Sequence, residues 1–197
     1  DGRWIVFASP VEGSQELWRV EVDGRRIERL TRGRHCVSGA RLVAAGARGA
    51  SRVAAIRASG VEPPDVVVGE IPGGRLNADA SVSLAPVSSL MREAWAGIRL
   101  VTPVERWHEV DGHRVQGWFI GSPASTKAKP APVVIEIHGG PATLYGWSLM
   151  WEWQVLAATG ISVYACNPRG SQGYGQAFLT ANVRDWGEGP MRDVMGG

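Results

Sequence analysis

The alternation of apolar and polar residues divides the chain into two halves of different texture. Up to about residue 100, short runs alternate with a period of two and are separated by Gly, Pro and Ser. The pattern predicts strands at residues 3–8, 16–22, 25–30, 41–45, 52–57 and 65–70. Short strands that recur about every 8–12 residues are typical of an all-β sandwich, barrel or propeller.

Beyond residue 101 the pattern becomes that of an α/β domain. An Asp-Gly turn at 111–112 joins two alternating runs and predicts a hairpin over residues 105–120. Apolar runs at 132–138 and 161–166 predict two adjacent parallel strands that are buried on both faces. Between and after them, helices are expected at residues 147–159, at 176–186 and from Pro190 onward, with Gly160 ending the first. Strand, helix, strand and helix in this order predict a parallel sheet with right-handed crossovers.

Composition excludes several classes of protein. The 21 Lys and Arg residues nearly balance the 19 Asp and Glu residues, and a net charge of +2 is too small for an electrostatic nucleic-acid binder. The longest apolar run is only the length of a strand, so no membrane span is expected. Two distant cysteines, Cys36 and Cys166, do not suggest a disulfide scaffold, which favours a reducing, cytoplasmic location.

The sharpest motif is His138-Gly139-Gly140-Pro141, which follows the first of the two apolar runs. Open α/β sheets bind their ligands at the carboxyl ends of the strands. In α/β-hydrolases a His-Gly-Gly sequence after a strand supplies one N–H of the oxyanion hole. Glycine suits this role because a Cβ would obstruct the approach of a backbone N–H to the oxyanion. The alternative is a plain turn with a structural histidine.

A second motif, Asn-Pro-Arg-Gly-Ser-Gln-Gly-Tyr-Gly at 167–175, follows the second apolar run. With the His-Gly-Gly-Pro turn, Trp186-Gly187 and the Asp-x-x-Gly spacing of Asp193 and Gly196, it resembles the prolyl oligopeptidase family of serine peptidases, in its acylaminoacyl-peptidase and dipeptidyl-peptidase-like branch. The resemblance is specific over residues 105–197 and weaker over 1–100. It implies β-propeller blades at 1–100, only part of a propeller, and the N-terminal part of an α/β-hydrolase domain at 101–197.

The resemblance also implies roles for individual residues. Gly140 matches the backbone donor of the oxyanion hole, and His138 and Gly139 shape its turn. Arg169 and Ser171 match loop positions beside the site, where bracing of the sheet edge is favoured and contact with substrate is the alternative. Tyr174 is open to two interpretations, a lining of the substrate cleft or core packing.

The nucleophile of the family is missing from the sequence. It would be a serine in Gly-x-Ser-x-Gly, followed by Asp and His. Ser171 has Gly173 after it but Arg169 before it, and no other serine has glycines at both positions. We therefore expect that the chain stops before the strand that would carry the nucleophile, and that it is inactive alone although its parent protein is active. The sheet would then be left partly uncovered at residues 133–137 and 162–166.

The leading hypothesis is thus part of a serine peptidase that hydrolyses short or N-blocked peptides by acyl transfer. An esterase-type α/β-hydrolase and a catalytically inactive propeller-hydrolase scaffold are the alternatives. No motif for a nucleotide is present in its required context, His108 and His113 lack a third metal ligand nearby, and we expect no cofactor and no metal. The expected partners are a short peptide substrate, the remainder of the parent protein and, as a further candidate, a second copy of the chain.

Overall fold

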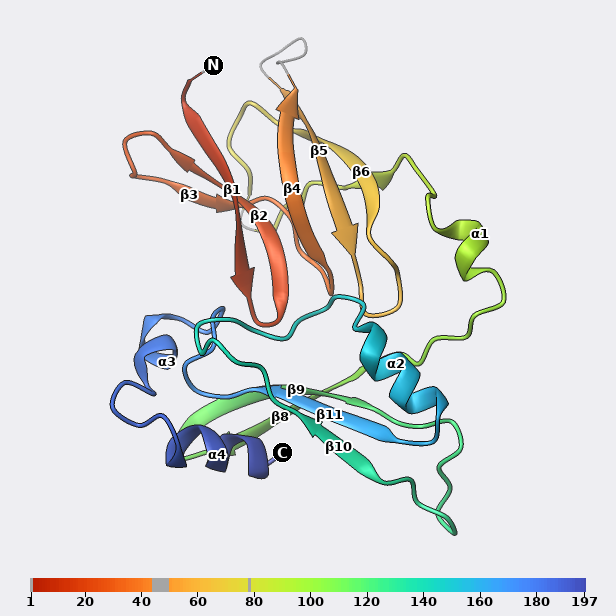
Figure 1. Cartoon of the computed structure of the whole chain (residues 1–197). Helices are drawn as coiled ribbons and strands as arrows, with labels where there is room; N and C mark the ends of the chain where they lie inside the picture. The colour runs from red at the N-terminus through yellow and green to blue at the C-terminus, as the bar shows by residue number, and fades with distance from the viewer. Residues whose placement is uncertain (1, 44–49, 78) are drawn as a thin grey trace.

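The computed structural model describes residues 2–43, 50–77 and 79–197 (Figure 1). Its strands are β1 (Trp4–Val11), β2 (Ser14–Glu21), β3 (Ile27–Arg29), β4 (Cys36–Val43), β5 (Ser51–Ala58), β6 (Asp65–Ile71), β7 (Ala85–Pro86), β8 (Val104–Val110), β9 (His113–Ile120), β10 (Val133–Glu136) and β11 (Ser162–Asn167). Its helices are α1 (Arg92–Trp95), α2 (Trp151–Ala158), α3 (Gln176–Thr180) and α4 (Glu188–Met195).

The first sheet contains the strands of the N-terminal half in the order β1-β2-β4-β5-β6-β7, with β3 paired to β2. Its pairs are antiparallel, except that one parallel pair, Gln15 with Cys36, joins β2 to β4. Two antiparallel groups, β1-β2-β3 and β4-β5-β6-β7, therefore lie side by side. The predicted strands are found, although β4 begins earlier than expected and residues 44–45 of its prediction lie outside the described residues. The assignment of these groups to a propeller stays a prediction.

The second sheet has the order β10-β11-β9-β8. The predicted hairpin of β8 and β9 and the predicted parallel pair of β10 and β11 are both confirmed. β11 also pairs antiparallel with β9, so the sheet is mixed rather than all parallel. Side chains alternate along β11: Val163 and Ala165 join a core that includes Trp153 of α2, whereas Tyr164 packs with Val194 of α4. The two helices thus cover opposite faces of the sheet.

The first two predicted helices are shorter than the sequence pattern suggests. The prediction of a helix from residue 147 is wrong, since α2 begins at Trp151 and Met150 before it is extended. The backbone N–H of Trp147 donates instead to the oxygen of Gly13 in the first half, at 2.7 Å. The helix expected over 176–186 is also wrong beyond Thr180, where turns follow. α4 contains Pro190 in its first turn, as predicted.

The expected burial of the two parallel strands is only half correct. All six residues of β11 are buried, so the expectation that residues 162–166 are uncovered is wrong. β10 lies at the edge of the sheet, and the expectation that it is buried on both faces is wrong: Val133 is 52% exposed and Ile135 is 41% exposed. Ile137, just after β10, is 62% exposed. The predicted exposure of residues 133–137 is therefore confirmed.

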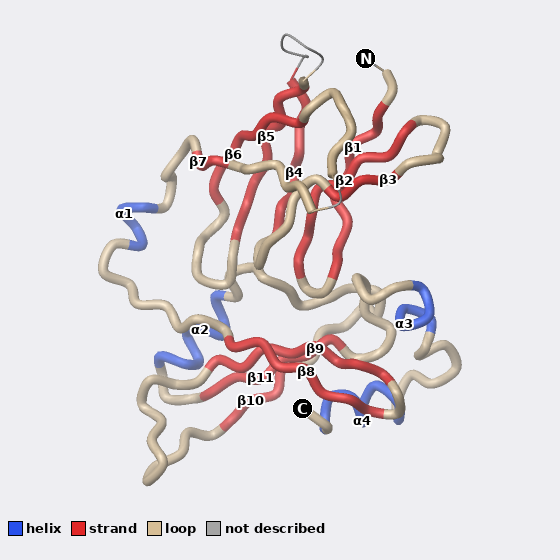
Figure 2. Tube along the Cα trace, turned by 180° about the vertical axis from the view of Figure 1, so that it is seen from behind, coloured by secondary structure: helices blue, strands red, loops and turns tan. Residues whose placement is uncertain are grey.

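The first sheet stands over the second, as both views show (Figures 1 and 2). The turn between β1 and β2 contacts the second sheet. It consists of Glu12 and Gly13, which both have positive φ, 45° and 70°. The N–H of Glu12 donates to the oxygen of Gly173 at 3.0 Å, and a Cβ on Gly13 would lie 2.5 Å from the ring of Trp118. Only glycine can fill this position. Within the described part of the chain, no helix is long and apolar enough to cross a bilayer.

Candidate active site

The His138–Pro141 turn follows β10 and lies beside the loop that follows β11. His138 Nε2 is 3.1 Å from Ser171 Oγ, and the buried Ser171 hydroxyl donates to the oxygen of Pro168 at 2.6 Å. The imidazole also packs edge-on against Tyr145, with 5.1 Å between ring centroids. The structure thus brings together the two sequence motifs, as expected where two adjacent parallel strands end.

The two glycines of the turn differ in what the chain requires of them. Gly140 has φ of +132°, and a Cβ there would meet Thr143 Cγ2 at 2.9 Å. A side chain at Gly140 would therefore strain the turn. At Gly139 no atom lies within 4 Å of the position that a Cβ would take, and its φ is not in the left-handed region. The need for glycine at residue 139 would have to come from a ligand rather than from the fold.

A cavity of about 380 Å³ opens between the turn, the loop after β11 and α4. Its polar lining comes from His138, Arg169, Ser171 and Asn182, together with the backbone of the two glycines. Its other walls are apolar and include Trp186 before α4 and Met191 within it. A mostly apolar cleft with a few convergent polar groups is the usual form of a small-ligand site.

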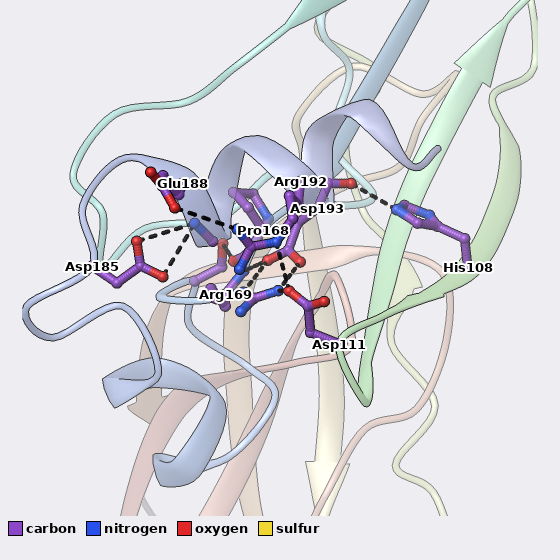
Figure 3. A network of polar contacts seen from close by, with 10 residues as sticks. His108, Asp111, Pro168, Arg169, Asp185, Glu188, Arg192 and Asp193 are labelled. Atoms are coloured by element: carbon purple, nitrogen blue, oxygen red, sulfur yellow. Dashed lines mark hydrogen bonds and ion pairs between the residues drawn. The ribbon is translucent and has the colours of Figure 1, made fainter.

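Arg169, which lines this cavity, is the centre of an ionic network whose buried part is its pair with Asp193 (Figure 3). Its Nη2 and Nε lie 2.7 and 2.9 Å from the carboxylate of Asp193, and its backbone N–H donates to the same carboxylate at 2.7 Å. Nη2 also reaches Asp111 at 2.9 Å, and Arg192 Nε reaches Asp111 at 2.8 Å. The hydrogen bonds from Arg192 and then Arg169 hold the pKa of Asp111 below its ordinary value.

This network joins the loop after β11, helix α4 and the β8–β9 turn. His108 on β8 adds a contact, its Nε2 lying 2.7 Å from the main-chain oxygen of Asp193 (Figure 3). Since three of the donors of Arg169 are already used within the protein, the geometry favours the predicted bracing role for Arg169. Ser171 braces the turn in the same way, through Pro168 and His138.

Tyr174 is not among the residues that line the cavity. Its ring packs against Phe178 at 5.0 Å and Trp107 at 6.2 Å, and its hydroxyl lies between Gln116 and Asn167. Burial raises the pKa of the phenol. Of its two interpretations, the structure favours packing.

Several residues that hold the site were not singled out from the sequence. Gln116 and Tyr145 carry no local signal, and the sequence marks Asp111 only as a turn residue, because the partners of all three are distant in sequence. Asp193 was noted only as part of a family motif, although its fixed spacing from Gly196 was the available clue. No group of three His, Cys, Asp or Glu side chains that could hold a metal ion occurs among the described residues.

Comparison with known proteins explains this geometry. The sequence pattern described as "Prolyl oligopeptidase family" matches residues 147–197. The chain is 36% identical over 109 residues to dipeptidyl-peptidase 5 of Schizosaccharomyces pombe, which covers 54% of the chain and 16% of that protein. It is 45% identical over 86 residues to an uncharacterized peptidase of Bacillus subtilis, covering 43% and 13%. The chain is therefore similar to the prolyl oligopeptidase family, whose pattern matches its last 51 residues.

Solved structures show the same fold. The acylaminoacyl peptidase of Pyrococcus horikoshii matches 98% of this chain with a TM-score of 0.79 and 20% identity. A puromycin-hydrolyzing peptidase of Mycobacterium tuberculosis matches 98% with a TM-score of 0.65 and 22% identity. The chain corresponds to 28% of each of these structures. The matched region is thus a minor part of the relatives' length.

Proposed function

We propose that this chain forms the oxyanion-turn part of a serine-type peptidase that hydrolyses short or N-blocked peptides by acyl transfer. One observation carries the proposal: a glycine-dependent turn at the carboxyl end of β10 opens onto a cavity that is closed by α4. The names of the relatives, a dipeptidyl-peptidase and acylaminoacyl peptidases, support the substrate class.

In this mechanism the backbone N–H of Gly140 donates a hydrogen bond to the oxyanion that forms when a serine attacks the peptide carbonyl. One such donor contributes roughly 2.7–4 kcal/mol of transition-state stabilisation in a complete site. His138 and Ser171 hold the turn, and Arg169 holds the loop beside it. The serine nucleophile, its histidine base, the orienting aspartate and a second oxyanion donor would come from residues outside these 197.

The unpaired edge of β10 supports this arrangement. Val133 and Ile135 point apolar side chains to solvent, and the outer edge of β10 has no strand partner among the described residues. A further strand that paired there would bring its carboxyl end next to Gly140 and the cavity. We propose that this strand carries the nucleophile, and that the first sheet forms propeller blades that restrict access to short peptides.

The test is a glycine-to-alanine comparison in the full-length product of the reading frame. Gly140→Ala strains the turn and displaces the donor, so kcat on an N-acetylated peptide anilide should fall about 10²–10³-fold while KM changes little. Gly74→Ala is the matched control, since Gly74 has room for a Cβ, lacks a positive φ and lies in the first sheet's half. Unchanged kcat in Gly140→Ala would rule out the oxyanion role.

Substrate choice tests the reaction class with the same protein. The proposal expects hydrolysis of N-acetylated peptide anilides as well as simple p-nitrophenyl esters. Hydrolysis of esters alone would indicate an esterase, and no turnover of either substrate would indicate a catalytically inactive scaffold. Either result would overturn the peptidase assignment.

A further inference from the structure

A continuous chain of polar contacts crosses the face of the second sheet that meets the first sheet. It begins at Glu105, whose Oε1 accepts from Gln116 Nε2 at 2.6 Å. Gln116 Oε1 accepts from the hydroxyl of Tyr174 at 2.5 Å, and the Tyr174 oxygen accepts from Asn167 Nδ2 at 2.6 Å. Asn167 then makes two hydrogen bonds to the main chain of Tyr145. It accepts from the backbone N–H at 2.7 Å and donates to the main-chain oxygen at 2.8 Å.

The direction of these hydrogen bonds is fixed by the carboxylate at the start. Glu105 can only accept, so the amide of Gln116 must donate to it and offer its oxygen to Tyr174. Because the Tyr174 hydroxyl donates to Gln116, its oxygen accepts from the amide of Asn167. The side-chain oxygen of Asn167 can then accept from the backbone N–H of Tyr145. Gln116 and Asn167 face each other across β9 and β11, and both side chains are fully buried. Buried chains of this kind polarise and strengthen one another.

The two ends of the chain lie in functionally different places. At one end, the ring of Tyr145 packs on the imidazole of His138, the first residue of the oxyanion turn. At the other end, Gln116 Nε2 also donates to the main-chain oxygen of Glu12 in the β1–β2 turn, at 3.1 Å. Glu105 additionally accepts from Arg34, which belongs to the first half, at 2.8 Å. The polar chain therefore connects the first sheet with the turn.

We infer that Gln116, Tyr174 and Asn167 are positioning residues that fix the oxyanion turn through Tyr145 and set it relative to the β1–β2 turn. The inference rests on the proposed function only for the oxyanion role of the turn. That the three residues position the turn does not depend on the proposed function. None of the three residues touches the cavity. Their effect on the site passes through the contact of Tyr145 with His138.

The test uses the 197-residue chain and needs no catalysis, so it separates this inference from the proposed peptidase activity. Tyr174→Phe keeps the ring on Phe178 and removes the hydroxyl that joins Gln116 to Asn167. The ring resonances of His138 in a two-dimensional ¹H–¹⁵N spectrum should move by more than their line width, with those of His35, which is held by Glu16 of the first sheet, unchanged.

Tyr164→Phe is the matched control, because it removes another buried hydroxyl from the same sheet. Tyr164 OH lies 3.4 Å from His108 Nδ1 on the opposite face, so this variant should move His108 and leave His138 in place. A folded Tyr174→Phe variant with unchanged His138 resonances would overturn the inference. So would an equal shift of His138 in both variants, since that would report a general loss of packing.

A measurement on the unaltered chain decides the matter if Tyr174→Phe does not fold. The inference expects a slowly exchanging Tyr174 hydroxyl proton, protected by its bond to Gln116, and nuclear Overhauser contacts between the rings of Tyr145 and His138. Absence of the protected proton or of the ring contacts would contradict it.

Discussion

β10 and β11 are neighbours in the same sheet, run parallel and have similarly apolar sequences, yet their surroundings differ completely. β11 lies between β9 and β10, with α2 on one face and α4 on the other, and all six of its residues are buried. β10 has a strand partner on one side only and leaves Val133 and Ile135 exposed. Apolar composition thus identifies a strand, whereas the number of its neighbours decides its burial.

The loops that follow these two strands also differ in how many contacts hold them. The loop after β11 is fixed by the buried pair of Arg169 and Asp193, which binds it to α4. The turn after β10 is held by His138, through single contacts to Ser171 and Tyr145. The loop after β11 is therefore the more firmly held of the two, whereas β10 leads into the glycine turn proposed to supply the backbone donor.

The largest expected effect comes from placing one charge on each strand. Val163→Asp in β11 puts an unpaired carboxylate into the core beside Trp153, and should lower the free energy of unfolding by about 4 kcal/mol or more. Val133→Asp in β10 meets solvent and should change it by less than about 0.5 kcal/mol. Urea denaturation of both variants measures the difference, and equal losses would show that β10 is as buried as β11.

The second effect concerns the support of the loop after β11. Asp193→Asn leaves Arg169 buried without its carboxylate and should cost about 3 kcal/mol in the free energy of unfolding. Glu188→Gln on the same helix is the control. Its side chain is 92% exposed and 3.8 Å from Arg192, so its cost should stay below about 0.5 kcal/mol. A small effect of Asp193→Asn would mean that the network does not stabilise the fold.

Sequence reasoning could recover the parts of this structure that depend on local signals. The Asp-Gly turn with its flanking alternation predicts the β8–β9 hairpin, and the apolar runs predict β10 and β11 as a parallel pair. The His-Gly-Gly-Pro and Asn-Pro-Arg-Gly-Ser motifs predict the two loops that meet at the cavity. Each of these features is encoded within a few neighbouring residues.

The features that were missed depend on distant partners. Trp147 is held by a hydrogen bond from its N–H to Gly13, more than a hundred positions earlier in the sequence, and Met150 is extended, so α2 begins only at Trp151. Gln116 looks like an ordinary strand residue until Asn167 and Tyr174 are brought to it by the fold. The exposure of β10 follows from the strand order, which no local pattern contains.

The third effect is a dependence on acid. Hydrogen bonds from Arg192 and Arg169 lower the pKa of Asp111 in the folded chain relative to about 3.9 in an unfolded chain. The stabilisation from Asp111 is therefore complete above about pH 3.9 and is lost as the pH falls through the lower folded value. Asp111→Asn, which suits the positive φ of 51°, should flatten the pH dependence of stability below about pH 4. An unchanged acid profile would contradict the assigned pairing.

The smallest effect on stability is expected at the edge of β10. Ile135→Lys should change the free energy of unfolding by less than about 0.5 kcal/mol, because the side chain is 41% exposed. It should nevertheless reduce concentration-dependent association, since a charged residue on an edge strand discourages pairing with another strand. Sedimentation velocity over a range of concentrations compares the variant with the unaltered chain. Equal association of the two would show that the β10 edge is not the site of contact.

The most direct test of the central claim is labelling with a serine-directed fluorophosphonate probe. These 197 residues contain the His138–Pro141 turn, for which we propose the oxyanion role, but no serine within Gly-x-Ser-x-Gly. The chain alone should therefore show neither labelling nor turnover of a blocked-peptide substrate. The full-length product of the reading frame should be labelled at one serine outside these residues, and Gly140→Ala should slow that labelling. Stoichiometric labelling of a serine within the 197 residues, with turnover, would contradict the account.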